Sequence, residues 1–248
     1  MKAPEMKAAM AAKTPMVGVS IMFSSPQLVE MIAALGFDWV LIDCEHGSID
    51  LSNLEVMAIA AKAAGITAIA RPPSNSSIDI MRVMDRGVDG VQVPHIKSQK
   101  EAKAAVESVK FHPLGNRGLA MGTRPSNYGI GVELDQYSKT SNLDSIVVLQ
   151  IEDREAIENL DDILSVADVD VFFVGPSDLS QSLGHPGKAN KPPVSTAITK
   201  IFRSISEAGL TSGTASSEKQ MEKAKKEGCC YLYTHLNNVL KLGAENYL

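Results

Sequence analysis

A glycine between a helix-forming stretch and a short apolar run recurs along the chain, and this repeat constrains the fold more than any other feature. It occurs at Gly36, Gly65, Gly87, Gly209 and Gly228. A glycine directly after a helix adopts the left-handed conformation that ends the helix, which other residues adopt only at a cost. The apolar runs that follow are continuous and not alternating, as in strands that are covered on both faces. The repeat therefore predicts alternating helices and parallel strands.

The apolar runs define eight strand candidates. They cover residues 16–22, 38–43, 66–71, 89–94, 145–152, 169–175, about 210–214 and 229–234. Eight strands that alternate with helices over 248 residues are typical of an α/β fold, the (β/α)₈ TIM barrel. An open doubly wound sheet alternates in the same way, but it usually has a glycine-rich phosphate turn after its first strand, which is missing here. We therefore predict a single (β/α)₈ barrel domain over residues 1–248.

Local signals mark two helix starts and one interruption of the repeat. Ser25-Pro26 places a capping residue before a proline at the first helical position, and Ser52-Asn53-Leu54-Glu55 has the pattern of a capping box. Residues from about 112 to 144 are rich in glycine and are predicted to form a long, loop-rich excursion of a length that is usually functional. Within it, residues 115–118 are predicted to form a turn that positions Arg117.

The charge balance argues against nucleic acid as a partner. Twenty-four Lys and Arg against 29 Asp and Glu give a net charge of −5, whereas nucleic-acid binders normally carry a basic surplus or patch. No apolar run approaches the ~20 residues that cross a membrane. Residues 1–13 also lack the apolar core of a secretion signal. We therefore expect a cytoplasmic protein without membrane or nucleic-acid partners.

Polar side chains gather where the predicted strands end. The carboxyl ends of barrel strands meet on one face, and active sites are built there. The runs end in Asp43-Cys44-Glu45-His46, Arg71-Pro72, Pro94-His95, Gln150-Ile151-Glu152-Asp153 and Gly175-Pro176-Ser177-Asp178. We expect these carboxylates, histidines and arginine to share one rim, and their clustering is stronger evidence than any single residue.

Glu152 and Asp178 are the candidate metal ligands on this rim. Mg²⁺ and Mn²⁺ favour a few carboxylates and keep open positions for water and substrate. The alternative is a rim salt bridge or a helix cap, because Asp178 follows Ser177 where a helix should begin. Gly175 to Ser177 would also suit an approach of backbone N–H groups to an anion at that helix N-terminus.

His46 and Arg71 are the candidate chemical groups. A histidine titrates near neutrality and suits proton transfer, although a lone loop histidine is more often inert. Arg71, which precedes two prolines, would clamp a carboxylate or stabilise a developing enolate; its alternative role is an ion pair across the rim. His95 also ends a strand and could line the pocket. No partners are evident for the other histidines, His112, His185 and His235.

Taken together, these segments resemble the HpcH/HpaI aldolase family, the class II pyruvate-type aldolases, which are also related to citrate lyase β subunits. The matching segments, in the family's order and spacing, are residues 36–46, 70–72, 93–94, 113–118, 150–152 and 175–180. The Glu-His element at residues 45–46 with Gly-Pro-Ser-Asp-Leu-Ser downstream is specific. The resemblance runs from about residue 16 to 188 and implies reversible cleavage of a 4-hydroxy-2-oxo acid into pyruvate and an aldehyde.

The resemblance also implies a role for each site residue. Glu152 and Asp178 would bind a divalent cation, Mg²⁺, Mn²⁺ or Co²⁺, which pyruvate would chelate through its carboxylate and keto oxygens. The cation would act as a Lewis acid that lowers the cost of removing a methyl proton and holds the enolate. His46 would be the base, directly or through metal-bound water, and Arg71 would stabilise the oxyanion.

Three further residues receive roles from the same resemblance. Asp85 would support the basicity of the histidine from an adjoining subunit, while Gln150 and the backbone at Ser177, beside Asp178, would contact the pyruvate. Family members commonly assemble as hexamers, so a homo-oligomer with a shared site is expected.

The resemblance weakens in the final third of the chain. Where the family usually has a strand ending Gly-x-Asp, residues 233–238 read Tyr-Thr-His-Leu-Asn-Asn, and residues 213–217 have small polar side chains where relatives place aliphatic ones against the aldehyde. A semialdehyde and a sugar-derived hydroxyaldehyde both fit this change. The alternatives are a CoA-ester lyase of the citryl- or malyl-CoA type, an oxaloacetate decarboxylase, and a non-catalytic metabolite-binding barrel.

Overall fold

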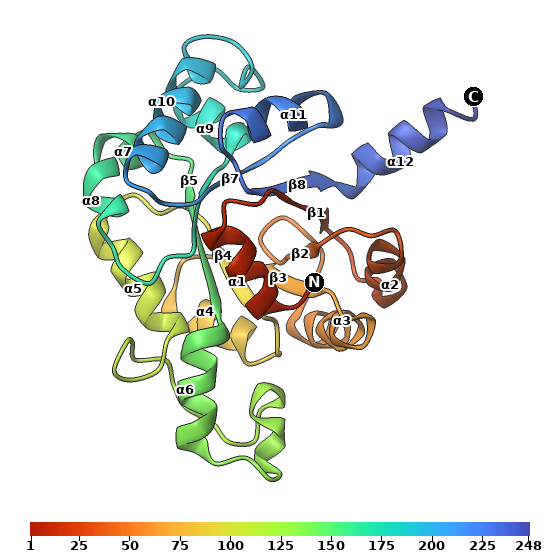
Figure 1. Ribbon diagram of the computed structural model, residues 1–248, viewed down its shortest axis with the longest axis vertical. Coiled ribbons are helices and arrows are strands. Elements are labelled where there is room, and N and C mark those ends of the chain that lie inside the picture. The colour runs from red at the N-terminus through yellow and green to blue at the C-terminus, as the bar shows by residue number, and fades with distance from the viewer.

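The computed structural model describes all 248 residues and contains a closed barrel of eight parallel strands (Figure 1). Each strand pairs with the next one in the chain, and β8 pairs with β1 to close the barrel. The strands are β1 (Met16–Ile21), β2 (Trp39–Asp43), β3 (Thr67–Arg71), β4 (Gly90–Val93), β5 (Ile146–Ile151), β6 (Val171–Val174), β7 (Ser212–Ala215) and β8 (Tyr231–His235). The predicted (β/α)₈ barrel is confirmed, and each predicted strand overlaps an observed one.

One helix precedes β1, and the others follow the strands, most of them covering the outside of the barrel (Figure 1). They are α1 (Ala3–Ala11), α2 (Pro26–Ala34), α3 (Leu51–Ala64), α4 (Ser77–Met84), α5 (Gln99–Val109), α6 (Leu134–Asp144), α7 (Arg154–Glu158), α8 (Leu160–Leu164), α9 (Pro176–Ser182), α10 (Val194–Glu207), α11 (Glu218–Lys226) and α12 (Leu236–Glu245). Helix α12 projects away from the barrel (Figure 1). None of these helices combines the length and the apolar character needed to span a membrane.

The helix ends follow the local signals with one exception. All five glycines of the repeat have positive φ, from 71° at Gly65 to 88° at Gly36. The Ser25 hydroxyl accepts a hydrogen bond from the Leu28 N–H at 3.2 Å and caps α2, as predicted. The capping box predicted at residues 52–55 is wrong, because α3 already begins at Leu51. Asp50 is its cap and accepts a hydrogen bond from the Asn53 N–H at 2.8 Å.

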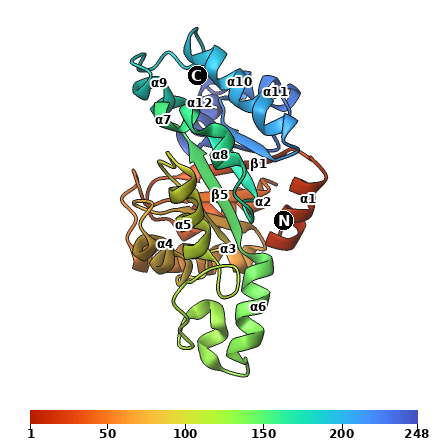
Figure 2. The same cartoon turned by 90° about the vertical axis from the view of Figure 1, so that its left-hand side faces the viewer.

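The excursion at residues 112–144 is more ordered than predicted. It contains a short 3₁₀ segment, Arg124–Gly129, and the 11-residue helix α6. The helix escaped prediction because it shows no apolar stripe; Tyr137 is its one buried residue. Figure 2 shows that α6 and its neighbouring loops extend beyond the end of the barrel at which the strands begin. The excursion therefore lies opposite the rim that carries the predicted site residues.

Two apolar layers hold the barrel together. Between strands and helices lies a cluster of 44 buried residues, and inside the barrel lies a second cluster of 13. The inner cluster is aromatic, with the Trp39 and Tyr231 rings stacked at a centroid distance of 4.1 Å. Gly18 makes room for Trp39, since a Cβ there would lie 2.5 Å from the indole ring. Met6 and Met10 of α1 join this cluster and close the amino-terminal end of the barrel.

Candidate functional site

A buried ion pair joins the ends of β2 and β3. Asp43 and Arg71 are in register, with Arg71 Nε 3.0 Å from Asp43 Oδ1 and Nη2 2.5 Å from Oδ2. Burial raises the pKa of the Asp43 carboxyl, but the hydrogen bond and charge of Arg71 outweigh this and leave the pKa below its usual value. Burial opposes the charge of Arg71 as well, yet the partner carboxylates raise its pKa. The guanidinium is therefore permanently charged and fixed in orientation.

The loop after β2 places Glu45 and His46 beside this pair. The Asp43 carboxylate accepts hydrogen bonds from the backbone N–H groups of Glu45, at 3.1 Å, and His46, at 3.2 Å. Glu45 Oε2 lies 3.1 Å from Arg71 Nε. The His46 side chain is 53% exposed, and its Nε2 lies 3.8 Å from Glu45 Oε2. The backbone of His46 is thus held by Asp43, while its imidazole remains open to the rim.

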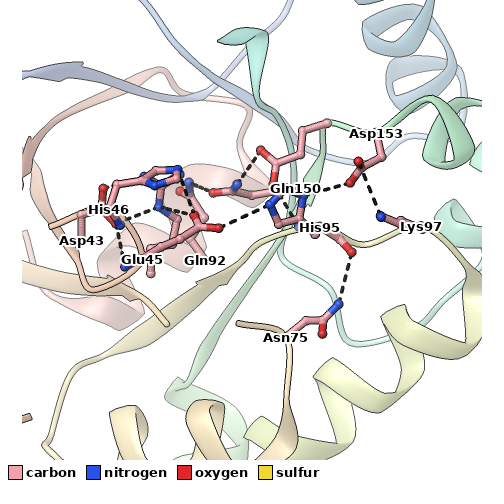
Figure 3. A network of polar contacts seen from close by, with 11 residues as sticks. Asp43, Glu45, His46, Asn75, Gln92, His95, Lys97, Gln150 and Asp153 are labelled. Carbon is pink, nitrogen blue, oxygen red and sulfur yellow. Dashed lines mark hydrogen bonds and ion pairs between the residues drawn. The ribbon is translucent and has the colours of Figure 1, made fainter. Parts of the chain in front are cut away.

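His95 bridges the two halves of the rim (Figure 3). Its Nε2 lies 3.5 Å from Glu45 Oε1, and its Nδ1 lies 3.0 Å from Asp153 Oδ2. Its backbone has φ +54°, a left-handed conformation that is uncommon outside glycine, and its N–H donates to Glu152 Oε1 at 2.9 Å. Burial lowers the pKa of His95, but Asp153, Glu152 and Glu45 together raise it above its usual value.

Glu152 is the second buried carboxylate of the site, with 1% of its surface exposed. Its Oε2 accepts a hydrogen bond from Gln150 Nε2 at 2.7 Å, and Gln150 is in turn bonded to Gln92. Burial raises the pKa of Glu152 to about 7, and the charge of Asp178 adds to the rise against the opposing hydrogen bonds. Gly175 packs against this carboxylate, because a Cβ there would lie 2.3 Å from Glu152 Oε2.

Asp178 and Ser177 lie in the first turn of α9, which follows β6. Asp178 is half-buried and forms neither a hydrogen bond nor an ion pair through its side chain, and the N-cap of α9 is Gly175. Asp178 is therefore neither a salt-bridge partner nor the N-cap of α9, the two alternatives considered for it. No group of three or more His, Cys, Asp or Glu side chains is arranged to hold a metal ion.

Asp85 lies away from this rim. It is the C-cap of α4, at the end of the barrel where the strands begin, and its Oδ1 accepts a hydrogen bond from Arg117 Nη2 at 2.6 Å. Arg117 is buried and lies over the Phe111 ring, 4.8 Å from its centroid. The turn predicted at residues 115–118 lies earlier, at residues 112–114, and the segment that follows it directs Arg117 toward Asp85 and not toward the rim.

The structure thus brings together His46, Arg71 and Glu152, with Gln150 and Asp178 beside them, and it separates Asp85 from them. The polar residues of this network to which sequence reasoning assigned no individual role are Asp43, Glu45, Gln92 and Asp153. A signal for Gln92 was present, because it is a polar residue within the apolar run Val91–Val93. Its side chain accepts a hydrogen bond from the Tyr231 hydroxyl at 3.0 Å across the barrel interior.

Known proteins of similar sequence and structure point to one family. The family HpcH/HpaI aldolase/citrate lyase matches residues 17–231. The chain is 32% identical over 221 residues to the hydroxypyruvate/pyruvate aldolase of Sagittula stellata, which covers 89% of this chain and 86% of that protein. It is 35% identical over 207 residues to the 5-keto-4-deoxy-D-glucarate aldolase of Shigella boydii, covering 84% and 79%. A crystal structure of a HpcH/HpaI aldolase/citrate lyase family protein from Burkholderia cenocepacia superposes with a TM-score of 0.91 at 26% identity, covering 98% and 96%.

Proposed function

Because the chain belongs to the HpcH/HpaI aldolase/citrate lyase family and is a pyruvate-type aldolase, we propose that it reversibly cleaves a 4-hydroxy-2-oxo acid into pyruvate and an aldehyde with the help of a divalent cation. The family is generally dependent on such a cation. An aldolase is a carbon–carbon lyase, so the alternative of a non-catalytic binding barrel is set aside.

The buried Glu152 carboxylate is the observation that carries this proposal. A buried carboxylate is costly unless a positive charge compensates it. Arg71, the nearby arginine, is already paired with Asp43 and Glu45, and the charge of Asp178 adds a further repulsion. A cation between Glu152 and Asp178 would relieve this cost.

The donor set therefore fits a small, hard cation. Two carboxylates leave most coordination positions to water and substrate, which is how Mg²⁺ and Mn²⁺ are usually bound at catalytic sites. Glu152 and Asp178 would be the protein ligands, with Mg²⁺, Mn²⁺ or Co²⁺ as candidates. When bound, such a cation would supply Lewis-acid polarisation of the pyruvate keto group.

The side chains around this position would perform the remaining steps. His46, whose ring is open to the rim, would take a proton from the pyruvate methyl carbon, and the electron pair would move onto the keto oxygen. The fixed Arg71 guanidinium would stabilise that developing negative charge. In the aldol-forming direction, the electron pair would return from the keto oxygen as the methyl carbon bonds to the aldehyde carbon, and protonated His46 would return its proton to the resulting alkoxide. Gln150 and the backbone N–H of Ser177 would orient the pyruvate.

Asp85 belongs to this proposal only through a second copy of the chain. Within one chain it lies at the opposite end of the barrel from His46, so it would support a histidine only across a subunit interface. A homo-oligomer, a hexamer in the proposal, would provide that interface. Light scattering of the purified protein, with wild type and Asp85→Asn compared, tests whether such an assembly forms and whether Asp85 acts within it.

Removal of the cation tests the proposed function. Protein stripped with EDTA should lose pyruvate release from a 4-hydroxy-2-oxo acid and the exchange of pyruvate methyl protons with deuterated water. Added Mg²⁺, Mn²⁺ or Co²⁺ should restore both. His46→Ala should lose both even with cation, whereas His112→Ala, at an exposed histidine away from the rim, should retain them. Full activity in the stripped protein would overturn the proposal.

A further inference from the structure

One arc of the rim is not used by the proposed pyruvate site. The residues assigned to that site come from β3, β5, the loops that follow β2 and β5, and the first turn of α9, which follows β6. Because the barrel is closed in chain order, the remaining arc consists of β7, β8 and β1. A second substrate that reacts above the barrel therefore has this arc as its free wall.

His235 and Ser20 are the inward-facing polar residues of this arc. On β8, Tyr231 and Tyr233 belong to the inner cluster and Leu232 to the outer one, so alternation along the strand turns His235 inward. On β1 the outer cluster contains Val19 and Ile21, which turns Ser20 inward. The two residues are paired in register on neighbouring strands, so their side chains are adjacent.

The His235 ring is uncommitted. It lies edge-on to Tyr233, with centroids 5.5 Å apart, and it takes part in no hydrogen bond or ion pair. Although His235 is the N-cap residue of α12, its side chain does not cap the helix. Burial lowers the pKa of His235, and the charge of Arg71 lowers it further. A neutral imidazole has one donor and one acceptor nitrogen, so the ring can bind a hydroxyl group in either direction.

Ser20 is a second, independent observation that points to a ligand, because its buried hydroxyl lacks a hydrogen-bond partner. Its surface is 1% exposed, and its hydroxyl has no hydrogen-bond partner. Buried hydroxyl groups in native proteins are normally partnered, so an exception calls for an explanation. On the other side of β8, the inward residue at the end of β7 is Ala215, whose side chain is small.

We propose that His235, with Ser20 beside it, forms a subsite that binds a hydroxyl group of the aldehyde, so that the enzyme prefers hydroxylated aldehydes over unsubstituted ones. This inference rests on the proposed aldolase function and identifies the class of its second substrate. The charges near the arc favour a hydroxyl over a carboxylate, because Arg71 is shared by two carboxylates, Asp43 and Glu45. The amide groups at the start of α12 favour an anion, so a carboxylated aldehyde is the competing outcome.

Aldehyde preference in the aldol-forming direction tests the subsite. With pyruvate and Mg²⁺, kcat/KM is measured for glycolaldehyde, acetaldehyde and glyoxylate, which differ in having a hydroxyl group, neither group, or a carboxylate. Wild type should prefer glycolaldehyde to both. His235→Leu should lower the glycolaldehyde-to-acetaldehyde ratio by about tenfold, the value of one hydrogen bond lost in the transition state. His235→Asn, which keeps a donor and an acceptor, should retain most of the preference.

Matched variants separate the subsite from general damage. His112→Leu changes an exposed histidine elsewhere and should leave the ratio at the wild-type value, whereas Ser20→Ala should lower it by a few fold. His235→Ala is measured alongside His235→Leu, so that a folding defect in one variant does not decide the result. A ratio unchanged in both His235 variants, or a wild-type preference for glyoxylate, overturns the inference.

The exchange of pyruvate methyl protons distinguishes this failure from failure of the proposed function. Exchange needs pyruvate and cation but no aldehyde, so it reports on the pyruvate site alone. Wild type that exchanges protons but shows no hydroxyl preference overturns the subsite and leaves the aldolase intact. Wild type that exchanges nothing with any cation overturns the proposed function, and the subsite with it.

Discussion

The two arcs of the barrel rim use their polar groups in opposite ways. From β2 to β5 the polar side chains form a connected network, in which Asp43 pairs with Arg71, Arg71 and His95 both contact Glu45, and the His95 backbone N–H donates to Glu152. From β7 to β1, His235 and Ser20 bond to nothing. A site that stabilises the same charge in every turnover benefits from donors fixed in advance. A subsite that binds the second substrate, the aldehyde, needs donors and acceptors that are not already paired within the protein. This difference is why we propose that the first arc binds pyruvate and the second binds the aldehyde.

Loss of the arginine should have the largest effect on stability. Arg71→Met leaves the Asp43 charge buried without a partner, which should lower the free energy of unfolding by about 3–5 kcal/mol. Asp43→Asn in the same background should recover much of that loss. His235→Leu, in the arc without committed bonds, should change stability by less than about 1 kcal/mol. Urea unfolding measures all three, and equal losses for the Arg71 and His235 variants would contradict the comparison.

Loss of the buried carboxylate should have the next largest effect, and it should fall on the chemistry. Glu152→Gln removes one proposed cation ligand and, with it, several kcal/mol of transition-state stabilisation, which corresponds to at least about a hundredfold slower methyl-proton exchange. Cation affinity measured by calorimetry should fall with it. Glu155→Gln, at an exposed position of α7, is the matched control and should behave as wild type. Unchanged affinity in Glu152→Gln would remove Glu152 from the cation site.

In protein freed of cation, Glu152 in one arc and His235 in the other should change the free energy of unfolding in opposite directions as the pH rises. The folded-state pKa of Glu152 is raised from 4.5 to about 7, so the folded state keeps this proton longer than the unfolded chain. Protonation of Glu152 therefore adds up to about 3 kcal/mol to the free energy of unfolding; this stabilisation is present below pH ~4.5 and is lost as the pH rises to ~7. The pKa of His235 is lowered, so its contribution is present above the usual histidine value of about 6.5 and is lost as the pH falls below it.

Urea unfolding in EDTA across pH 4–8 tests these signs. As the pH rises, wild type should lose stability relative to Glu152→Gln, and as the pH falls, wild type should lose stability relative to His235→Leu. Differences that run parallel for the two variants would contradict the opposite electrostatic settings of the two arcs.

The smallest expected effect concerns a single hydroxyl. Ser20→Ala removes a buried group without a partner and should raise the free energy of unfolding by up to about 1 kcal/mol. Ser126 is equally buried, but its hydroxyl donates to backbone carbonyl oxygens, including that of Thr123 at 2.8 Å. Ser126→Ala should therefore lower stability by about 1 kcal/mol. A loss in both variants would indicate that Ser20 has a partner in solution and is not a free position.

Local sequence signals predicted the fold well where the physical cause is itself local. The glycines after helices and the cap at Ser25 depend on residues within one turn, and all of them have the expected conformation. The prediction failed where two local signals competed, because Asp50 takes the cap that was assigned to Ser52. It also failed at α6, whose burial comes from packing of the excursion and not from an apolar stripe of its own.

The sequence by itself determined the barrel and placed His46, Arg71, Glu152 and Asp178 at strand ends, because the repeat of helix, glycine and apolar run dictates which ends converge. Only the tertiary structure decided which of the polar side chains at those ends pair with one another and which remain unpaired. Which carboxylate pairs with Arg71, that Asp85 turns toward Arg117, and that His235 remains unpaired all depend on the register of the closed barrel. That register pairs residues 215 positions apart, such as Met16 with Tyr231 and Ser20 with His235 on the neighbouring strands β1 and β8, and no local pattern specifies it.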